Sequence, residues 1–186
     1  KLFNGASLGG NERLVNYFCW AGRLDLNRLY SAEFKAALGE CDPTKPMLDF
    51  IEDFSKDINP LERLLALERR FFLSDHNLLY TDKMSMAAGV EVRVPFLDLE
   101  LIEYAASIPS NLKQKGAEGK WILKKAMEQY LPREVIYRSK SGFGAPLRRW
   151  MKFELREFLG DVLSEETLKR RGLFDPSAVQ NLILEN

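Results

Sequence analysis

Two acidic residues and the only histidine of the chain lie within one short stretch, SDHNLLYTDKM, at residues 74–84. Asp75 and Asp82 are seven residues apart, a spacing that puts both on one face if the stretch is an α-helix. Such a face could bind a cation or hold a carboxylate beside a metal-bound phosphate. The structural alternative is that Ser74 or Asp75 caps the start of a helix. The spacing alone leaves both interpretations open.

A second candidate is the basic, glycine-rich stretch RSKSGFGAP at residues 138–146. Its composition predicts a loop, in which Arg138 and Lys140 stand next to a serine and two glycines. A lysine on such a loop can reach phosphate or developing negative charge, and glycine allows close backbone approach. The simpler interpretation is a solvated basic loop.

Other potential sites are weaker. The GGNE stretch at residues 9–12 lacks both the phosphate-loop and the dinucleotide-binding glycine patterns, so it predicts a turn before a helix. Cys19 and Cys41 have no ligand partner at metal-site spacing, and His76 is the only histidine. These features argue against a zinc site and favour buried or half-buried reduced thiols, as in a cytosolic protein.

The stretch MSMAAGVEVRVPFLD breaks the helical spacing of its surroundings. Val90, Val92 and Val94 alternate there with Glu91 and Arg93, which is typical of extended backbone. We expect this segment to cross the helical core with its valines inward and the two charges paired on the other side. Structural pinning is the simpler role, and direct contact with a substrate is the alternative.

Helical spacing elsewhere predicts an all-α fold, a multi-helix bundle with this one short extended segment. Asn11, Asn59, Asp98, Ser164 and Asp175 are the expected helix caps. The expected helices begin near Asn11, Pro46, Pro60, Asp98 and Lys120 and then cover about 148–162, 164–171 and 176–184. Polar or Gly/Pro-rich segments at 40–46, 109–119 and 139–146 separate some of them, and no boundary indicates a second domain.

Composition limits the class of protein. The 186 residues are 46% hydrophobic and 29% charged, which is globular composition. Equal numbers of basic and acidic residues, 27 each, argue against nucleic acid or an anionic membrane as the main partner. No apolar run is long enough to span a bilayer, and no signal-peptide pattern opens the sequence. The sequence begins with Lys1 and without a helix start, so we expect a cytoplasmic protein cut from a longer chain.

Two stretches together resemble the synthetase domain of glutamine-dependent asparagine synthetases, a domain shared with β-lactam synthetase relatives. They are DKMSMAAGVEVRVPFLD and LPREVIYRSKSGFGAPLRRWM, and the resemblance runs from LFNG at the start to about Met151. It implies that residues 1–186 form the C-terminal, helical part of that domain. The family's glutaminase domain and its S-G-G-x-D-S pyrophosphate loop would then lie upstream of these residues.

The resemblance also implies a reaction. The family uses ATP to adenylate the side-chain carboxylate of aspartate, and ammonia released from glutamine then attacks the acyl-adenylate. Lys140 matches the family's essential lysine, which stabilises the transition state electrostatically. Asp75 is the candidate general base, although neighbouring positions fit the alignment nearly as well. Glu91, Arg93 and Asp98 would pack behind the substrate pocket.

ATP and Mg²⁺ are implied by the same resemblance, with their main binding residues upstream of this chain. Small-molecule substrates are the expected partners, and the family allows a homodimer formed through the full-length protein. We expect the isolated chain to be inactive. Two alternatives remain: a related enzyme that closes a β-lactam or amidates another acceptor, and a non-catalytic helical interaction module.

Overall fold

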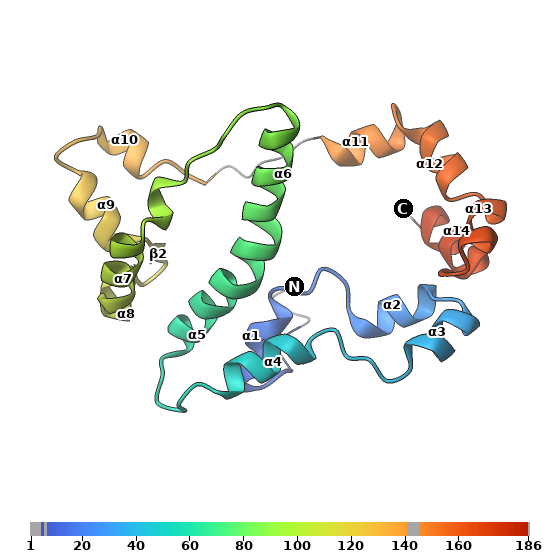
Figure 1. Ribbon diagram of the computed structural model, residues 1–186, viewed down its shortest axis with the longest axis horizontal. Coiled ribbons are helices and arrows are strands. Elements are labelled where there is room, and N and C mark those ends of the chain that lie inside the picture. Colours follow the sequence, from blue (N-terminus) through green and yellow to red (C-terminus); the bar gives the residue numbers. More distant parts are fainter. Residues whose placement is uncertain (1–4, 6, 141–145, 186) are drawn as a thin grey trace. The chain divides into compact units, whose positions relative to one another are not determined.

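The computed structural model describes Gly5, residues 7–140 and residues 146–185. The expected all-α class is confirmed, since the strands among these residues form only one hairpin, with two residues in each strand (Figure 1). In chain order the elements are α1 (Gly10–Asn16), α2 (Arg23–Leu29), α3 (Ala32–Leu38), α4 (Lys45–Glu52), α5 (Pro60–Leu67), η1 (Glu68–Leu78), α6 (Leu79–Ala87), η2 (Pro95–Leu97), α7 (Leu99–Ser107), α8 (Ser110–Lys113), β1 (Gln114–Lys115), β2 (Glu118–Gly119), α9 (Trp121–Met127), α10 (Arg133–Ile136), α11 (Leu147–Lys152), α12 (Arg156–Val162), α13 (Glu165–Arg171) and α14 (Pro176–Leu184).

The chain divides into two compact units, neither of which is continuous in sequence. The first unit contains residues 1–18 and 44–139, and the second contains residues 19–43 and 140–186. The chain passes from one unit to the other at three points, and two of these points lie in the polar segments 40–46 and 139–146. Because the units interleave along the chain, no single linker marks a domain boundary in the sequence.

Four of the predicted caps are confirmed. The side-chain oxygens of Asn59, Asp98, Ser164 and Asp175 each accept a hydrogen bond from a backbone N–H of the first helical turn. The cap predicted at Asn11 is wrong, because α1 begins one residue earlier, after extended Gly9. The Asn11 amide oxygen instead accepts a hydrogen bond from the Arg63 guanidinium, 2.9 Å away.

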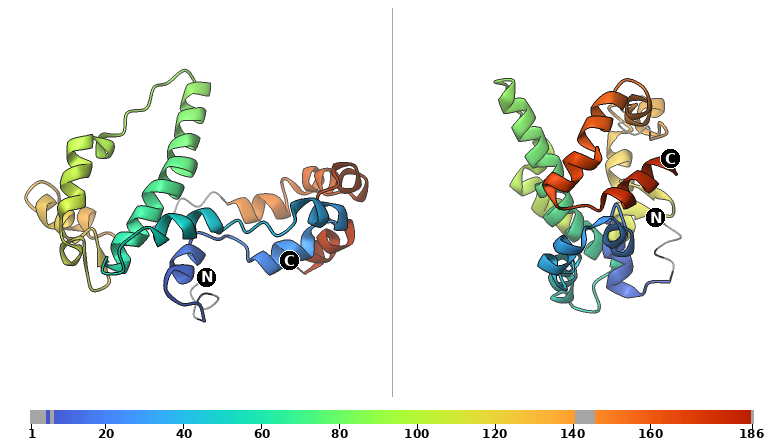
Figure 2. Two further views of the ribbon diagram at one scale, coloured as in Figure 1. Left: turned by 60° about the horizontal axis from the view of Figure 1, so that its bottom comes forward. Right: turned by 90° about the vertical axis from the view of Figure 1, so that its right-hand side faces the viewer.

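The elements α5, η1 and α6 continue into one another as a single long helical rod (Figures 1 and 2). Its middle, Glu68–Leu78, is π-helical, a conformation that is rare in proteins and frequent at functional sites. The Ser74 hydroxyl donates to the carbonyl of Arg70 one turn earlier. The interpretation of Ser74 or Asp75 as a cap is therefore wrong, since both lie within the rod.

The core of the first unit lies where α1 and α4 pack on the start of this rod. Val15, Ile51 and Leu67 are buried there, at 2%, 0% and 0% exposure. The rings of Phe50 and Phe71 meet edge to face at its border, with centroids 5.6 Å apart. This packing fixes the rod against the N-terminal helices.

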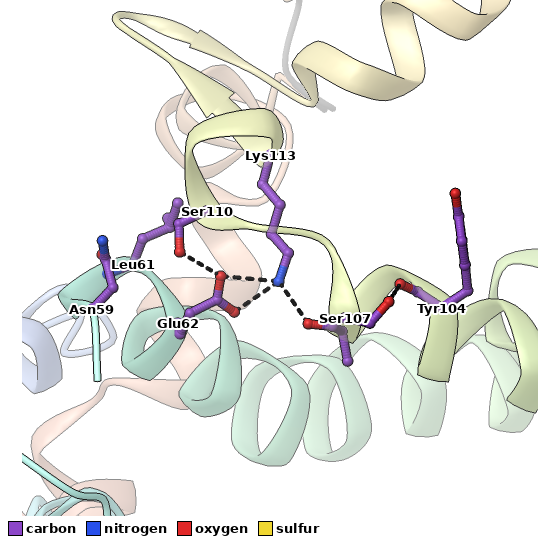
Figure 3. A network of polar contacts seen from close by, with 8 residues as sticks. Asn59, Leu61, Glu62, Tyr104, Ser107, Ser110 and Lys113 are labelled. Atoms are coloured by element: carbon purple, nitrogen blue, oxygen red, sulfur yellow. Dashed lines mark hydrogen bonds and ion pairs between the residues drawn. The ribbon is translucent and has the colours of Figure 1, made fainter. Parts of the chain in front are cut away.

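A second set of contacts holds α8 to the same rod. Glu62 in α5 accepts hydrogen bonds from the Lys113 ammonium and the Ser110 hydroxyl (Figure 3). After α8, the hairpin pairs Gln114 with Gly119 and Lys115 with Glu118 in antiparallel register. Gly116 forms its turn with φ +59°, a conformation that glycine adopts without strain.

The second unit joins its two chain segments through backbone and ring contacts. The Asp175 N–H donates to the Leu29 carbonyl at 2.8 Å. Tyr30 and Phe174 stack with centroids 5.8 Å apart. Leu168 of α13 and Val179 of α14 are buried. The segment predicted as one helix over 148–162 is instead interrupted between α11 and α12.

The valine stretch is not helical and Val94 is extended, but the expected burial of the valines is wrong. Val90, Val92 and Val94 are 57%, 45% and 41% exposed. The stretch runs from the end of α6 to η2 and connects the ends of these elements instead of passing between helices (Figure 1). Glu91 and Arg93 do pair, at 2.7 Å, in solvent. Within the described ranges, no helix combines the length and apolar character needed to cross a membrane.

Candidate functional site

Lys140 lies on exposed backbone just after α10 and is the first residue of the second unit. Tyr137 ends α10, with its N–H bonded to the Arg133 carbonyl at 3.0 Å. The loop character predicted for the lysine is therefore confirmed at Lys140 itself. Residues 141–145, which contain the two glycines of the same stretch, lie outside the described residues.

Asp75 lies in the π-helical part of the rod. One carboxylate oxygen accepts a hydrogen bond from the Ser74 hydroxyl at 2.9 Å and lies 3.9 Å from the Arg70 guanidinium. Its side chain is 62% exposed, so a reactant could approach it from solvent. A π turn contains more residues than an α turn, so the seven-residue spacing to Asp82 no longer corresponds to two turns.

Asp75 belongs to the first unit and Lys140 begins the second. The pairing of these two residues in one site stays a prediction.

A cavity of about 430 Å³ lies where the valine stretch leaves α6. Its lining residues include Thr81, Asp82, Ser85 and Glu91. A hydrogen bond of 2.9 Å from the Val90 N–H to the Ser85 carbonyl turns the chain back at this point. A carboxylate such as that of Asp82 can accept a proton or bind an amine, whereas the Glu91 carboxylate already pairs with Arg93. Sequence reasoning assigned Glu91 to packing and missed this arrangement, which depends on the turn.

The described residues do not by themselves fit a metal site. They contain no group of three or more His, Cys, Asp or Glu side chains that could hold an ion. In proteins, Mg²⁺ is usually bound by one or two carboxylates together with substrate phosphates and water. We therefore assign no Mg²⁺ site, and no step through that ion, to this part of the chain.

A polar cluster precedes Lys140, and no motif in the sequence predicts it. The Tyr137 hydroxyl donates to Oε1 of Glu128 at 2.6 Å, and the Lys125 ammonium donates to the same oxygen at 2.8 Å. The Tyr137 ring also faces two cations, with its centroid 5.4 Å from the Lys124 ammonium and 4.7 Å from the Arg133 guanidinium.

The charges in this cluster reinforce one another. The hydrogen bonds from Lys125 and then Tyr137 lower the pKa of Glu128. The same carboxylate raises the pKa of Lys125 and of Tyr137. The carboxylate is thus kept ionised and the phenol protonated around neutral pH, which is the combination that the hydrogen bond requires.

Comparison with known proteins places the chain in a family. A family model described as asparagine synthase matches residues 11–186. The chain is 43% identical over 111 residues to asparagine synthetase [glutamine-hydrolyzing] 1 of Bacillus subtilis, covering 60% of this chain and 18% of that protein. It is 32% identical over 165 residues to asparagine synthetase [glutamine-hydrolyzing] 3 of the same organism, covering 88% and 25%.

A third relative carries a different name. The amidase chyE of Penicillium rubens is 28% identical over 139 residues, covering 71% of this chain and 21% of that protein. The chain thus spans about a fifth to a quarter of the length of these relatives. No solved structure matches it significantly. The family match extends over nearly the whole sequence, and the chain therefore belongs to the asparagine synthase family.

Proposed function

We propose that this chain is the helical, C-terminal part of the synthetase domain of an ATP-dependent carbon–nitrogen ligase. Its substrates are ATP, aspartate and ammonia derived from glutamine, and its product is asparagine. The single observation that carries this proposal is the family match over residues 11–186. Two relatives named asparagine synthetase, which are 43% and 32% identical in the matched regions, support it.

In the first step, a side-chain carboxylate oxygen of aspartate attacks the α-phosphorus of ATP and pyrophosphate leaves. In the second, ammonia attacks the acyl carbon of the adenylate, loses a proton and expels AMP. Both steps build negative charge on oxygen. Lys140, exposed on its loop, would stabilise that charge through its ammonium group.

A carboxylate would accept the proton that the attacking ammonia loses. Asp75 is the first candidate because its side chain is accessible and already oriented by Ser74 and Arg70. Asp82 is the neighbouring alternative, because it lines the cavity beside Thr81 and Ser85. Asp75→Asn and Asp82→Asn differ from the parent residues by one charge and little volume. The variant that slows the ammonia-dependent step and spares adenylation identifies the base.

A second candidate function keeps the same chemistry but uses another carboxylic acid as acceptor. It is considered because one relative is named as an amidase, so the names of the chain's relatives are not confined to asparagine synthetase. The two functions are distinguished by supplying aspartate or alternative carboxylic acids to the full-length protein. Asparagine formation, detected by mass spectrometry, supports the first. Pyrophosphate release that depends on another acid supports the second.

The decisive test of a catalytic role is Lys140→Ala in the full-length protein that carries this chain. We expect aspartate-dependent pyrophosphate release to fall by roughly a hundredfold or more, because a donor aimed at developing charge is removed. Lys56→Ala is the matched control, since Lys56 is exposed in a turn of the first unit. Unchanged turnover in Lys140→Ala would overturn the proposal and favour a non-catalytic helical module.

A further inference from the structure

Tyr137 stands three residues before Lys140 and is the last residue in this stretch held by side-chain contacts that the structure records. Three residues of extended chain span at most about 11 Å. The position of Tyr137 therefore limits the region that the Lys140 backbone can reach. A fixed Tyr137 would give the segment that leads to Lys140, residues 138–140 (the Lys140 loop), a defined starting point.

The partner of Tyr137 is itself well connected. Glu128 follows directly after α9 and also binds Lys125 of that helix. Lys124, which faces the Tyr137 ring, bonds to Glu118 in β2 at 3.1 Å. On the other strand of the hairpin, the Lys115 ammonium lies 4.7 Å from the centroid of the Trp121 ring in α9.

These contacts continue to the long rod. The β1 strand directly follows α8, and Lys113 at the end of α8 binds Glu62 of α5 (Figure 3). Together with the backbone of the hairpin, these hydrogen bonds, ion pairs and ring contacts link Tyr137 to α5 of the first unit. Glu128 is the only carboxylate that the described residues place within hydrogen-bonding distance of the Tyr137 hydroxyl.

We propose that Glu128 and Tyr137 are positioning residues that anchor the start of the Lys140 loop to α9 and so orient Lys140 for the reaction. The inference rests on the proposed function, because it assigns the anchor a purpose only if Lys140 acts on substrate. The hydrogen bond supplies direction, and the Lys124 and Arg133 cations restrain the ring plane. Misplacement of a catalytic group by about 1 Å can cost as much as a hundredfold in rate.

The test compares three variants of the full-length protein: Tyr137→Phe, Tyr137→Ala and the control Tyr130→Phe. Tyr137→Phe removes only the hydroxyl and keeps the ring between its cations. Tyr137→Ala removes both contacts. Tyr130 lies nearby in the sequence, and 69% of its surface is exposed. The first readout is limited trypsin digestion, in which mass spectrometry follows cleavage after Arg138 and is independent of activity.

The second readout is steady-state kinetics, normalised to folded protein by a thermal melt. We expect cleavage after Arg138 to be fastest in Tyr137→Ala, slower in Tyr137→Phe and slowest in the parent protein. Tyr130→Phe should be cleaved at the same rate as the parent. We expect kcat to fall by roughly threefold in Tyr137→Phe and tenfold or more in Tyr137→Ala, with KM values for ATP and aspartate nearly unchanged. A general loss of folding would instead lower the melting temperature and expose cleavage sites throughout the chain.

Two outcomes overturn the proposal. One is unchanged cleavage after Arg138 in both Tyr137 variants, and the other is faster cleavage without any change in kcat. Failure of the proposed function has a separate signature, because Lys140→Ala would then retain full turnover whatever the Tyr137 variants do. The digestion would still report in that case whether Tyr137 anchors the loop.

Discussion

The Lys113 ammonium lies 2.8 Å and 2.9 Å from the two carboxylate oxygens of Glu62, a residue 51 positions earlier in the chain. It also donates to the Ala106 carbonyl at 3.3 Å, while the Ser110 hydroxyl donates to Glu62 at 2.8 Å (Figure 3). The two side chains are only 16% and 30% exposed. One partly buried ion pair thus connects the rod to the segment that leads, through the hairpin and α9, to Tyr137.

We expect Lys113→Met to lower the free energy of unfolding by about 1–2 kcal/mol, because Glu62 would keep its partial burial and lose its charged partner. Lys45→Met is the matched control, since Lys45 pairs with Asp49 at the same 2.8 Å but with side chains 70% and 55% exposed. That change should cost about 0.5 kcal/mol or less. Urea titrations of both variants measure the difference, and equal losses would contradict the importance assigned to burial.

The same pair predicts a pH dependence. Partial burial raises the pKa of Glu62, but hydrogen bonds from Lys113 and Ser110 outweigh this effect and leave the pKa below its ordinary value of 4.5. A carboxylate whose pKa is depressed on folding stabilises the protein fully above its unfolded pKa. This stabilisation is lost as the pH falls through the folded pKa. The stability advantage of the parent over Glu62→Gln should therefore be constant near pH 7 and shrink below about pH 4.5. An advantage that grew on acidification would contradict this assignment.

Local chemistry explains why the helix starts could be predicted from the sequence. Asn59, Asp98 and Asp175 act on N–H groups two or three residues away, so their role depends on little beyond their immediate neighbours. Asn11 has the same side chain as Asn59, but Arg63 binds it from 52 residues away. A contact of that range cannot be deduced from the cap pattern.

The other features that differ from the sequence-based predictions also depend on more than the spacing of neighbouring residues. The alternation of Val90, Val92 and Val94 correctly indicated a break in the helices, but burial requires a neighbouring surface, and spacing does not specify one. The π-helical turns around Asp75 preserve the helical pattern while changing its period. The Tyr137–Glu128 anchor joins residues nine positions apart across the junction between two helices, so no single helical period relates them.

The rod should be most sensitive to substitution where it meets α1 and α4. We expect Leu67→Ala to lower the free energy of unfolding by about 2–5 kcal/mol, because the side chain is fully buried and a cavity would remain. Leu79→Ala is the matched control farther along the same rod, where 52% of the residue is exposed. It should cost about 1 kcal/mol or less. Comparable losses measured by urea denaturation would mean that Leu79 is covered in solution.

The 186-residue chain by itself should not catalyse exchange between ATP and pyrophosphate. The family's S-G-G-x-D-S pyrophosphate loop does not occur in its sequence, and its described residues offer no cluster of three or more metal ligands. Under the proposed function, Lys140 would stabilise charge on a phosphate that another part of the protein holds in place. The measurement is incorporation of labelled pyrophosphate into ATP in the presence of aspartate, with the Lys140→Ala chain as control. Exchange by the parent chain that this substitution abolishes would show that these residues bind ATP unaided, and it would contradict the assignment of the nucleotide site to an upstream segment.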